Sequence, residues 1–389
     1  MNILEVNDLQ SQHGWAEKVM YDIKDILEQN WHSVFVFWGE KETIFSFFDR
    51  YFSIINLIKT LILIRRHKID VVHVHNCSRI ISPSPIIAAK ILNKKVVMTL
   101  HDFHFFCPKT WWILWNGKEC VRGFNWLCYL KNCNTFKKWW SYAPYHFIKR
   151  LKVWLHRIII KRNVDFFISP SSKLRDNMIK SLWLNPLTII HLPNFINVPS
   201  DHRVNFTNFE SNRLLYVGRI SLEKWTSVLI KAIEVIVKNK WFNDLHVDII
   251  WDGPQKQLLE NLTKHMWLDK YIHFLWKVEN QKLKKYYEQC CAVIIPSVCQ
   301  DNNPLVAIEA MKFWRPIIAS NIWWIPDLVK NNENWYLFEM WDYNDLAGKI
   351  LKIVNNDDDT KSMWQVGFNK LMTEYNSDLF YNKLINIYT

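Results

Sequence analysis

Glycine is scarce in this chain. The 389 residues include 8 glycines and 22 tryptophans. Eight glycines are about 2% of the chain, against roughly 7% in an average protein. Turns and helix ends with a left-handed backbone normally use glycine, because a Cβ atom is strained there. Glycine and tryptophan together make about 7.7% of the chain, which is close to an ordinary glycine content. The composition therefore suggests that tryptophan stands where glycine is expected.

The chain also lacks long uncharged segments. No window of about 20 residues is free of charge, so we expect no membrane-spanning helix. The first ten residues contain Glu5 and Asp8, where a secretory signal would have an apolar run. We expect a cytoplasmic protein, and we expect its eight cysteines to be reduced.

Closely spaced cysteine pairs are absent from the segment richest in cysteine. Cys107, Cys120, Cys128 and Cys133 are separated by 12, 7 and 4 residues. Four thiolates could complete a tetrahedral zinc site, but structural zinc sites usually contain C-x₂-C pairs. Reduced thiols without a metal are the main interpretation, and a zinc site is the alternative.

Acidic residues are outnumbered by basic ones. The net charge of +12 favours anionic partners such as nucleotides, nucleic acids or anionic membranes. Residues 131–163 contain nine Lys or Arg among aromatic residues, and no Asp or Glu. This pattern fits a helix on an anionic bilayer and equally a helix that packs on a sheet with a solvated basic face. The apolar segment 45–66 could extend such a face, but we interpret it as a core helix. The candidate membrane contacts are Lys137, Lys138, Lys149, Arg150 and Arg157.

Apolar runs alternate with amphipathic segments along the whole chain. The runs are continuous, which is typical of strands that are buried on both faces of a parallel sheet. Helical segments such as 16–30, 227–240 and 280–290 separate them. This order predicts the doubly wound α/β class. The expected strands are 33–37, 71–75, 95–100, 166–171, 214–218, 246–250, 272–275, 292–297 and 316–320.

A polar segment interrupts this series. Residues 199–212 have no strand pattern, and we interpret them as an interdomain linker. The predicted domains are residues 1–198 and 213–376. Both have the alternating pattern of an α/β domain.

Eight sequence blocks occur in a recognisable order: 13–19, 70–76, 99–108, 168–179, 216–233, 249–262, 274–297 and 301–329. They resemble the GT-B glycosyltransferases of family 4, and the resemblance covers nearly the whole chain. It implies two Rossmann-like domains that face each other across a cleft. The first would bind the acceptor and the second the nucleotide sugar, with residues 377–389 packing back on the first.

The resemblance implies a retaining glycosyltransferase. Such an enzyme moves a sugar from a nucleoside diphosphate sugar to a lipid-linked or polysaccharide acceptor in cell-envelope glycan synthesis. It would be cytoplasmic or peripheral on the inner face of the membrane, without metal, cofactor or nucleic-acid partner. One alternative is a non-catalytic membrane- or carbohydrate-binding protein whose cleft is blocked by Trp15 and Trp324. Another is a sugar-nucleotide epimerase.

Two cations follow an expected strand of the second domain. Arg219 and Lys224 are assigned by the resemblance to the donor diphosphate. Arginine can bind phosphate through two bonds, and lysine acts as a point charge. The alternative is a pair of surface cations near Glu223.

Two acidic residues, Asp301 and Glu309, are separated by seven residues, as in the paired-acid motif of the family. The resemblance places Glu309 at the ribose, where a carboxylate can accept two hydrogen bonds from the diol. It places Asp301 near the donor sugar. Leu305 and Val306 open the intervening helix, where backbone N–H groups suit phosphate. The alternative is a helix-capping Asp and a surface Glu.

The first domain contributes a histidine at a strand end. The resemblance gives His101 a hydrogen bond to a donor-sugar hydroxyl and completes the catalytic set with Asp301 and Glu309. His73 and His75 share one face of a strand, and we interpret them as packing residues. The resemblance also implies a donor or acceptor loop at Gly14 and Trp15, and a base-binding region at Gly253 and Val278.

Twelve tryptophans occupy positions where the resemblance expects glycine. Some bacterial lineages read UGA as glycine, whereas a common alternative table reads it as tryptophan. We therefore hypothesise that UGA-encoded glycines are written here as tryptophan. Positions 15, 31, 183, 225, 251, 276, 314, 323, 324, 335, 341 and 364 make up this set.

Overall fold

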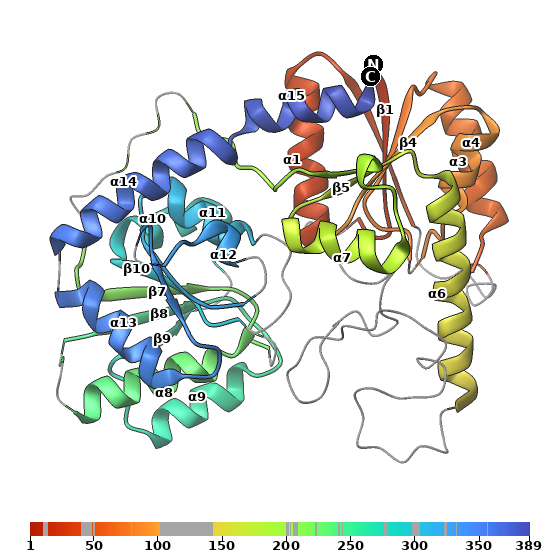
Figure 1. Cartoon of the computed structure of the whole chain (residues 1–389). Coiled ribbons are helices and arrows are strands. Elements are labelled where there is room, and N and C mark those ends of the chain that lie inside the picture. Colours follow the sequence, from red (N-terminus) through yellow and green to blue (C-terminus); the bar gives the residue numbers. More distant parts are fainter. Residues whose placement is uncertain are drawn as a thin grey trace. The chain divides into compact units, whose positions relative to one another are not determined.

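The computed structural model divides the chain into two compact units (Figure 1). The first comprises Met1–Asn194 together with Phe380–Thr389, and the second comprises Phe195–Leu379. The expected linker, 199–212, falls within the second unit. The described residues are 1–10, 15–39, 49, 51–78, 80–101, 143–199, 202, 204, 209–221, 224–239, 242, 244–275, 278–297, 304–322, 325–331, 333–355 and 357–389.

The first unit is built on a six-stranded sheet in the order β2-β1-β3-β4-β5-β6. Every strand pair in it is parallel. Figure 1 shows α1 and α15 on one side of this sheet and α3, α4 and α6 on the other. The strands are β1 (Asn2–Asn7), β2 (Ser33–Trp38), β3 (Val71–Val74), β4 (Lys95–Thr99), β5 (Phe166–Ser169) and β6 (Ile189–His191). The helices are α1 (Trp15–Gln29), α3 (Ile54–Arg66), α4 (Ser84–Ile91), α6 (Ala143–Asn163), α7 (Ser172–Leu182), the 3₁₀ turn η1 (Pro186–Thr188) and α15 (Ser377–Tyr388).

The second unit repeats this plan. Its parallel sheet has the order β12-β11-β10-β7-β8-β9. The strands are β7 (Arg213–Val217), β8 (His246–Ile250), β9 (Ile272–Leu275), β10 (Ala292–Ile295), β11 (Ile317–Ser320) and β12 (Tyr336–Phe338). The helices are α8 (Thr226–Lys238), α9 (Lys256–His265), α10 (Asn280–Gln289), α11 (Leu305–Lys312), α12 (Ile325–Leu328), α13 (Tyr343–Asn355) and α14 (Asp357–Glu374).

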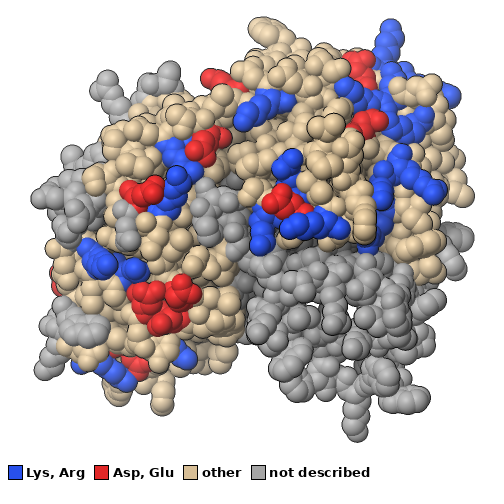
Figure 2. Space-filling model, viewed as in Figure 1, with Lys and Arg blue, Asp and Glu red and all other residues tan. Residues whose placement is uncertain are grey.

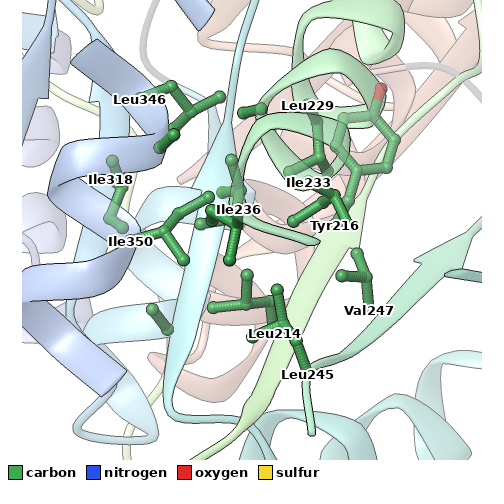
Figure 3. Close-up of a cluster of buried hydrophobic side chains, with 14 of the residues drawn as sticks. Leu214, Tyr216, Leu229, Ile233, Ile236, Leu245, Val247, Ile318, Leu346 and Ile350 are labelled. Carbon is green, nitrogen blue, oxygen red and sulfur yellow. The ribbon is translucent and has the colours of Figure 1, made fainter. Parts of the chain in front are cut away.

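Both faces of the second sheet are buried, which explains its continuous apolar strands. Along β7, Leu214 and Tyr216 join one hydrophobic cluster, whereas Leu215 and Val217 join another. Neighbouring residues of a strand point to opposite faces, so an apolar run covers both. Figure 3 shows the first cluster, where side chains of α8 and α13 close over β7.

The predicted fold class is confirmed. All nine predicted strands occur as strands of the two parallel sheets, and the three predicted helices occur as α1, α8 and α10. The core-helix interpretation of 45–66 is wrong for the part that forms α3. In α3 only Thr60 and Ile64 are buried, while four isoleucines are half or more exposed. None of the helices in the described part of the chain combines the length and apolar character that a bilayer crossing requires.

Seven described tryptophans have a positive φ. This left-handed region strains residues with a Cβ atom, at a cost of about 1–3 kcal/mol for each residue. Trp267 was not among the twelve positions expected from sequence. Trp335 and Trp364, which were, lie at ordinary φ values. The seven are Trp31 (65°), Trp183 (55°), Trp225 (47°), Trp251 (127°), Trp267 (59°), Trp314 (56°) and Trp341 (74°).

Three of these tryptophans end helices in the hydrogen-bond pattern that favours glycine. At the end of α11, Trp314 N–H donates to Met311 O, and Arg315 N–H donates to Ala310 O. This pair of bonds defines a Schellman motif, whose left-handed residue is usually glycine. Trp31 and Trp267 occupy the same place after α1 and α9. The backbone at these positions thus supports the hypothesis that glycine is the natural residue.

Trp335 conflicts with its surroundings in another way. Its side chain is 0% exposed, and its indole Nε1 has no hydrogen-bond partner. A buried N–H without a partner costs about 1–3 kcal/mol. A Cβ atom added to Gly367 would lie 2.4 Å from the indole Cζ2, so the ring fits only because position 367 has no side chain.

We predict that glycine stabilises the chain at the exposed positive-φ positions. Trp31, Trp183 and Trp267 are 95%, 83% and 83% exposed, so Trp→Gly there removes strain and little packing. The triple variant should gain about 1 kcal/mol per position, measured by urea unfolding. Trp154→Gly is the control. It lies within α6 and is 48% exposed, and it should lose about 1 kcal/mol. Equal losses in all variants would contradict the glycine hypothesis.

Candidate active site

The connections of the second sheet define where a ligand can bind. From β7 the chain passes to β8 on one side, and β10 lies on the other side. Loops that leave neighbouring strands in opposite directions open a crevice at the carboxyl edge of a parallel sheet. The carboxyl ends of β7 and β10 therefore flank the switch point of this sheet.

The two predicted diphosphate cations lie in the loop after β7. Arg219 comes two residues after the strand and is exposed, and Lys224 lies two residues before α8. The Tyr216 hydroxyl donates to Arg219 O at 3.2 Å, which ties the loop to its own strand. The structure thus places both residues beyond the carboxyl end of β7, beside the switch point of the sheet.

Gly253 allows the neighbouring loop to join the loop after β7. A Cβ at this position would lie 2.1 Å from Ile220 O, so only glycine fits. Ile220 N–H donates to Asp252 O, and Gln255 N–H donates to Ile220 O, both at 3.2 Å. These bonds clamp the loops after β7 and β8 together. Val278, the other predicted base-region residue, follows β9 and is half-buried.

The loop after β10 leads into α11. Leu305 and Val306 are the first residues of that helix, whose initial N–H groups have no acceptor within the helix. Together with the helix dipole, they favour an anion. Glu309 lies one turn further on, and the Tyr287 hydroxyl from α10 donates to its Oε2 at 2.8 Å. Tyr287 is buried and was not predicted from sequence.

Burial governs the ionisation of Tyr287. Burial raises the pKa of Tyr287 well above its usual range, and the Glu309 charge and hydrogen bond raise it further. The phenol therefore stays protonated and remains a donor to Glu309. The Tyr287 hydroxyl thus orients Glu309, the carboxylate that the family resemblance assigns to the ribose.

The first unit holds a buried polar cluster around His101. His101 follows β4, and its Nε2 lies 2.8 Å from His75 Nδ1. His75 Nε2 lies 2.7 Å from Glu5 Oε2. On the other side of Glu5, His73 Nδ1 is 3.3 Å from Oε1 and 2.6 Å from the Tyr388 hydroxyl. The sequence interpretation of His73 and His75 as buried packing residues did not include these partners.

Strand alternation explains why these groups meet. Glu5 in β1 lies opposite His73 in β3, and His73 lies opposite Val97 in β4. Residues two apart on a strand share a face, which brings His75, Thr99 and His101 to the same side. His73 Nε2 completes the cluster with a 2.8 Å contact to Thr99 Oγ1.

The charges in this cluster follow from burial and from the neighbours. Burial by itself raises the pKa of Glu5, but the charges and hydrogen bonds of His73 and His75 lower it to about 2. Burial lowers the pKa of His75, with a further lowering by His73 and an opposing effect of Glu5. Burial also holds the pKa of His101 well below its usual range. Near neutral pH, Glu5 is therefore ionised, and His75 and His101 are neutral.

Glu5, His73 and His75 lie close enough to share a metal ion. All four ring nitrogens of the two histidines, however, already have partners within the cluster. A metal would have to displace these hydrogen bonds. Hydrogen bonding therefore accounts for the cluster as it stands.

Several predicted positions lie outside the described residues. These are Gly14 and Asp301, Lys137 and Lys138, the four-cysteine segment, and three of the twelve tryptophan positions. Trp15 opens α1, and Lys149 and Arg150 lie in α6, but their side chains are not described. Arg157 is half-buried in α6, and its guanidinium donates to Ser181 O at 2.9 Å.

Two family models match the chain in succession. Glycosyltransferase Family 4 matches residues 24–198, and Glycosyl transferases group 1 matches residues 197–369. The chain belongs to the group 1 glycosyltransferases of the GT-B fold. The junction of the two matches lies close to the boundary between the two compact units of this chain.

Similar proteins and similar solved structures include further glycosyltransferases. An uncharacterized glycosyltransferase of Haemophilus influenzae is 27% identical over 183 residues, 46% of this chain and 49% of that protein. The chain thus spans about half the length of that relative. The UDP-Gal:α-D-GlcNAc-diphosphoundecaprenol α-1,3-galactosyltransferase of Escherichia coli is 24% identical over 79% of this chain and 73% of its own. The crystal structure of Anabaena HepE in complex with UDP has a TM-score of 0.70 at 15% identity and covers 99% of both chains. That likeness concerns the fold.

We predict that the chain loses stability on acidification below about pH 6.5, where unfolded histidine becomes protonated. The depressed pKa values of His75 and His101 make the unfolded state bind more protons, so stability is present above pH 6.5 and lost as pH falls. Each group contributes up to about 1.4 kcal/mol per pH unit.

Urea unfolding at pH 7, 6 and 5 checks this prediction. The His75→Asn/His101→Asn variant should show a flatter pH dependence than the unchanged chain. His265→Asn, at an exposed position in α9, is the control and should keep the original slope. Identical slopes in all three proteins would contradict the assignment of neutral buried histidines.

Proposed function

We propose that this chain is a retaining glycosyltransferase that uses a nucleoside diphosphate sugar. The observation that carries the proposal is the arrangement at the switch point of the second sheet. Arg219 and Lys224 lie on one side of it, and the N-terminus of α11 with Glu309 lies on the other. Two cations and the N–H groups of a helix start can bind the negative diphosphate, and a carboxylate can accept two hydrogen bonds from a ribose diol.

The chemistry follows from charge development. The bond between the anomeric carbon and the leaving phosphate oxygen breaks, and its electron pair stays on the diphosphate. The acceptor hydroxyl oxygen bonds to the anomeric carbon from the same face and passes its proton to the leaving phosphate. Arg219 and Lys224 stabilise the growing charge, and prepositioned cations do so most effectively where water is excluded.

The remaining residues orient the donor. Glu309 holds the ribose, with its carboxylate oriented by Tyr287. His101 hydrogen-bonds a hydroxyl of the donor sugar, and Asp301 is assigned to the same sugar. Gly253 and Val278 lie toward the base. No metal is needed in this scheme, because the cations and helix start carry the diphosphate charge.

The proposed acceptor is a lipid-linked or polysaccharide glycan of the cell envelope. The Escherichia coli relative is named for transfer to a diphosphoundecaprenol-linked sugar, which supports a lipid-linked acceptor. The first unit also has a surface suited to an anionic membrane. Ile54, Ile55, Ile58 and Ile62 of α3 are 64%, 50%, 51% and 57% exposed.

Basic residues accompany these isoleucines. Arg65 and Arg66 end α3, and both are exposed. In α6, Leu151 and Trp154 are also exposed, and His156 Nε2 lies 3.1 Å from Tyr51 O in the segment before α3. Figure 2 shows Lys and Arg side chains at the upper right, where Figure 1 draws α3 and α4. Apolar side chains beside cations suit the surface of an anionic bilayer.

The first test is donor turnover. A panel of sugar nucleotides is screened by release of nucleoside diphosphate, with and without polyprenyl-diphosphate sugars. Arg219→Ala should lower kcat/KM at least 100-fold for the active donor, since one electrostatic stabiliser contributes about that much. Lys238→Ala removes an exposed cation of α8 that pairs with Glu234 and should leave turnover unchanged. Tight membrane binding without turnover of any donor would instead favour the non-catalytic alternative.

The membrane surface is tested by vesicle sedimentation. Ile58→Glu/Ile62→Glu should weaken binding to vesicles with 30% anionic lipid at least tenfold, because it places charge on the apolar surface. Leu187→Glu changes an 82% exposed leucine of η1 and is the control. Equal binding by both variants would contradict this assignment.

A further inference from the structure

One line of hydrogen bonds leads from a buried charge to His101. Glu5 Oε2 contacts His75 Nε2 at 2.7 Å, and His75 Nδ1 contacts His101 Nε2 at 2.8 Å. The side chains of Glu5 and His75 are both 0% exposed. The ring planes of His75 and His101 differ by 25°, and their centroids lie 5.1 Å apart, as expected for two rings joined edge to edge by a hydrogen bond.

Proton positions along this line can be deduced in order. An ionised carboxylate only accepts hydrogen bonds, so His75 Nε2 must carry a proton. A neutral imidazole has one N–H, so His75 Nδ1 is an acceptor. His101 Nε2 must then donate to it, and the proton of a neutral His101 is thereby located. Its other nitrogen, Nδ1, becomes an acceptor.

A second group of contacts holds Glu5 from the other side. His73 Nδ1 lies 3.3 Å from Glu5 Oε1 and 2.6 Å from the Tyr388 hydroxyl. Burial and the Glu5 charge and hydrogen bond raise the pKa of Tyr388 well above its usual range, so this phenol keeps its proton. His73 Nδ1 and the Tyr388 hydroxyl thus lie on the Oε1 side of Glu5, where Oε1 has no hydrogen bond of standard geometry, while Oε2 faces His75.

We propose that Glu5 and His75 are positioning residues that hold His101 in the tautomer whose Nδ1 accepts a hydrogen bond. His101 then receives a hydrogen bond from a hydroxyl of the donor sugar and does not donate one. The inference rests on the proposed function for the identity of the ligand. The tautomer itself is a property of the unliganded protein. Tyr388 supports Glu5 from the last helix of the chain but has no contact with His75 in this line.

The variant Glu5→Gln should exchange donor and acceptor in both hydrogen bonds of this line. With its amide oxygen on the side of His73 and Tyr388, the NH₂ group would face His75 Nε2. His75 would then carry its proton on Nδ1 and donate to His101 Nε2. His101 would hold its proton on Nδ1 and could no longer accept there.

Two-bond ¹H–¹⁵N NMR of ¹⁵N-histidine-labelled protein measures these tautomers directly. His101→Asn and His73→Asn variants assign the signals. We expect Nε2–H tautomers for His75 and His101 in the unchanged chain at neutral pH, and Nδ1–H tautomers in Glu5→Gln. An Nδ1–H tautomer of His101 in the unchanged chain would overturn the proposal, as would a stoichiometric metal bound by His73 and His75. The unchanged chain alone decides this point if Glu5→Gln fails to fold.

Kinetics separates positioning from general structural support. Glu5→Gln and His101→Asn should each lower kcat at least 20-fold with the active donor. The double variant should be no slower than His101→Asn, because Glu5 acts through His101. If the kcat losses of the two single variants multiply in the double variant, Glu5 does not act through His101, and the positioning role is overturned. Glu28→Gln, a surface residue of α1 paired with Lys24, is the control and should keep full turnover. If the unchanged chain turns over none of the donors, the proposed function is rejected. The NMR result still decides the tautomer of His101 in that case.

Discussion

Parallel pairing of the strands is the constraint on which both candidate sites depend. Each strand of a parallel sheet ends at the same edge, so residues that follow different strands gather there. In the second unit this edge collects Arg219, Lys224 and the start of α11. In the first unit, pairing in register brings Glu5, His73 and His75 together, with His101 beyond the end of the next strand.

A buried charge imposes the second constraint. An isolated carboxylate inside a sheet would be very costly, so Glu5 needs a hydrogen-bond donor. His75 donates to Oε2 at 2.7 Å, and His73 Nδ1 lies 3.3 Å from Oε1, which has no hydrogen bond of standard geometry. The same requirement determines which nitrogen of each ring carries a proton. The buried charge of Glu5 thereby determines, through His75, the tautomer of His101 beyond the end of β4.

Much of the fold could be predicted from sequence, because apolar periodicity reports burial directly. The continuous runs predicted nine of the strands but not β1, β6 and β12, and the resemblance expected glycine at positions such as 31, 183 and 314. The Glu5–His75 and His73–Tyr388 contacts could not be predicted, since they join residues 70 and 315 positions apart. Tyr287 was missed because a buried tyrosine in an amphipathic helix has the pattern of a core residue. The exposed isoleucines of α3 were misassigned because hydrophobicity alone does not tell which residues are covered.

A crystal structure of the chain with a bound nucleoside diphosphate tests the proposed donor site most directly. We expect the diphosphate at the carboxyl edge of the second sheet, within hydrogen-bond distance of Arg219 and of the Leu305 and Val306 amides. The ribose should contact Glu309, which still receives the Tyr287 hydrogen bond. A nucleotide bound elsewhere under saturating conditions, with this edge vacant, would contradict this expectation.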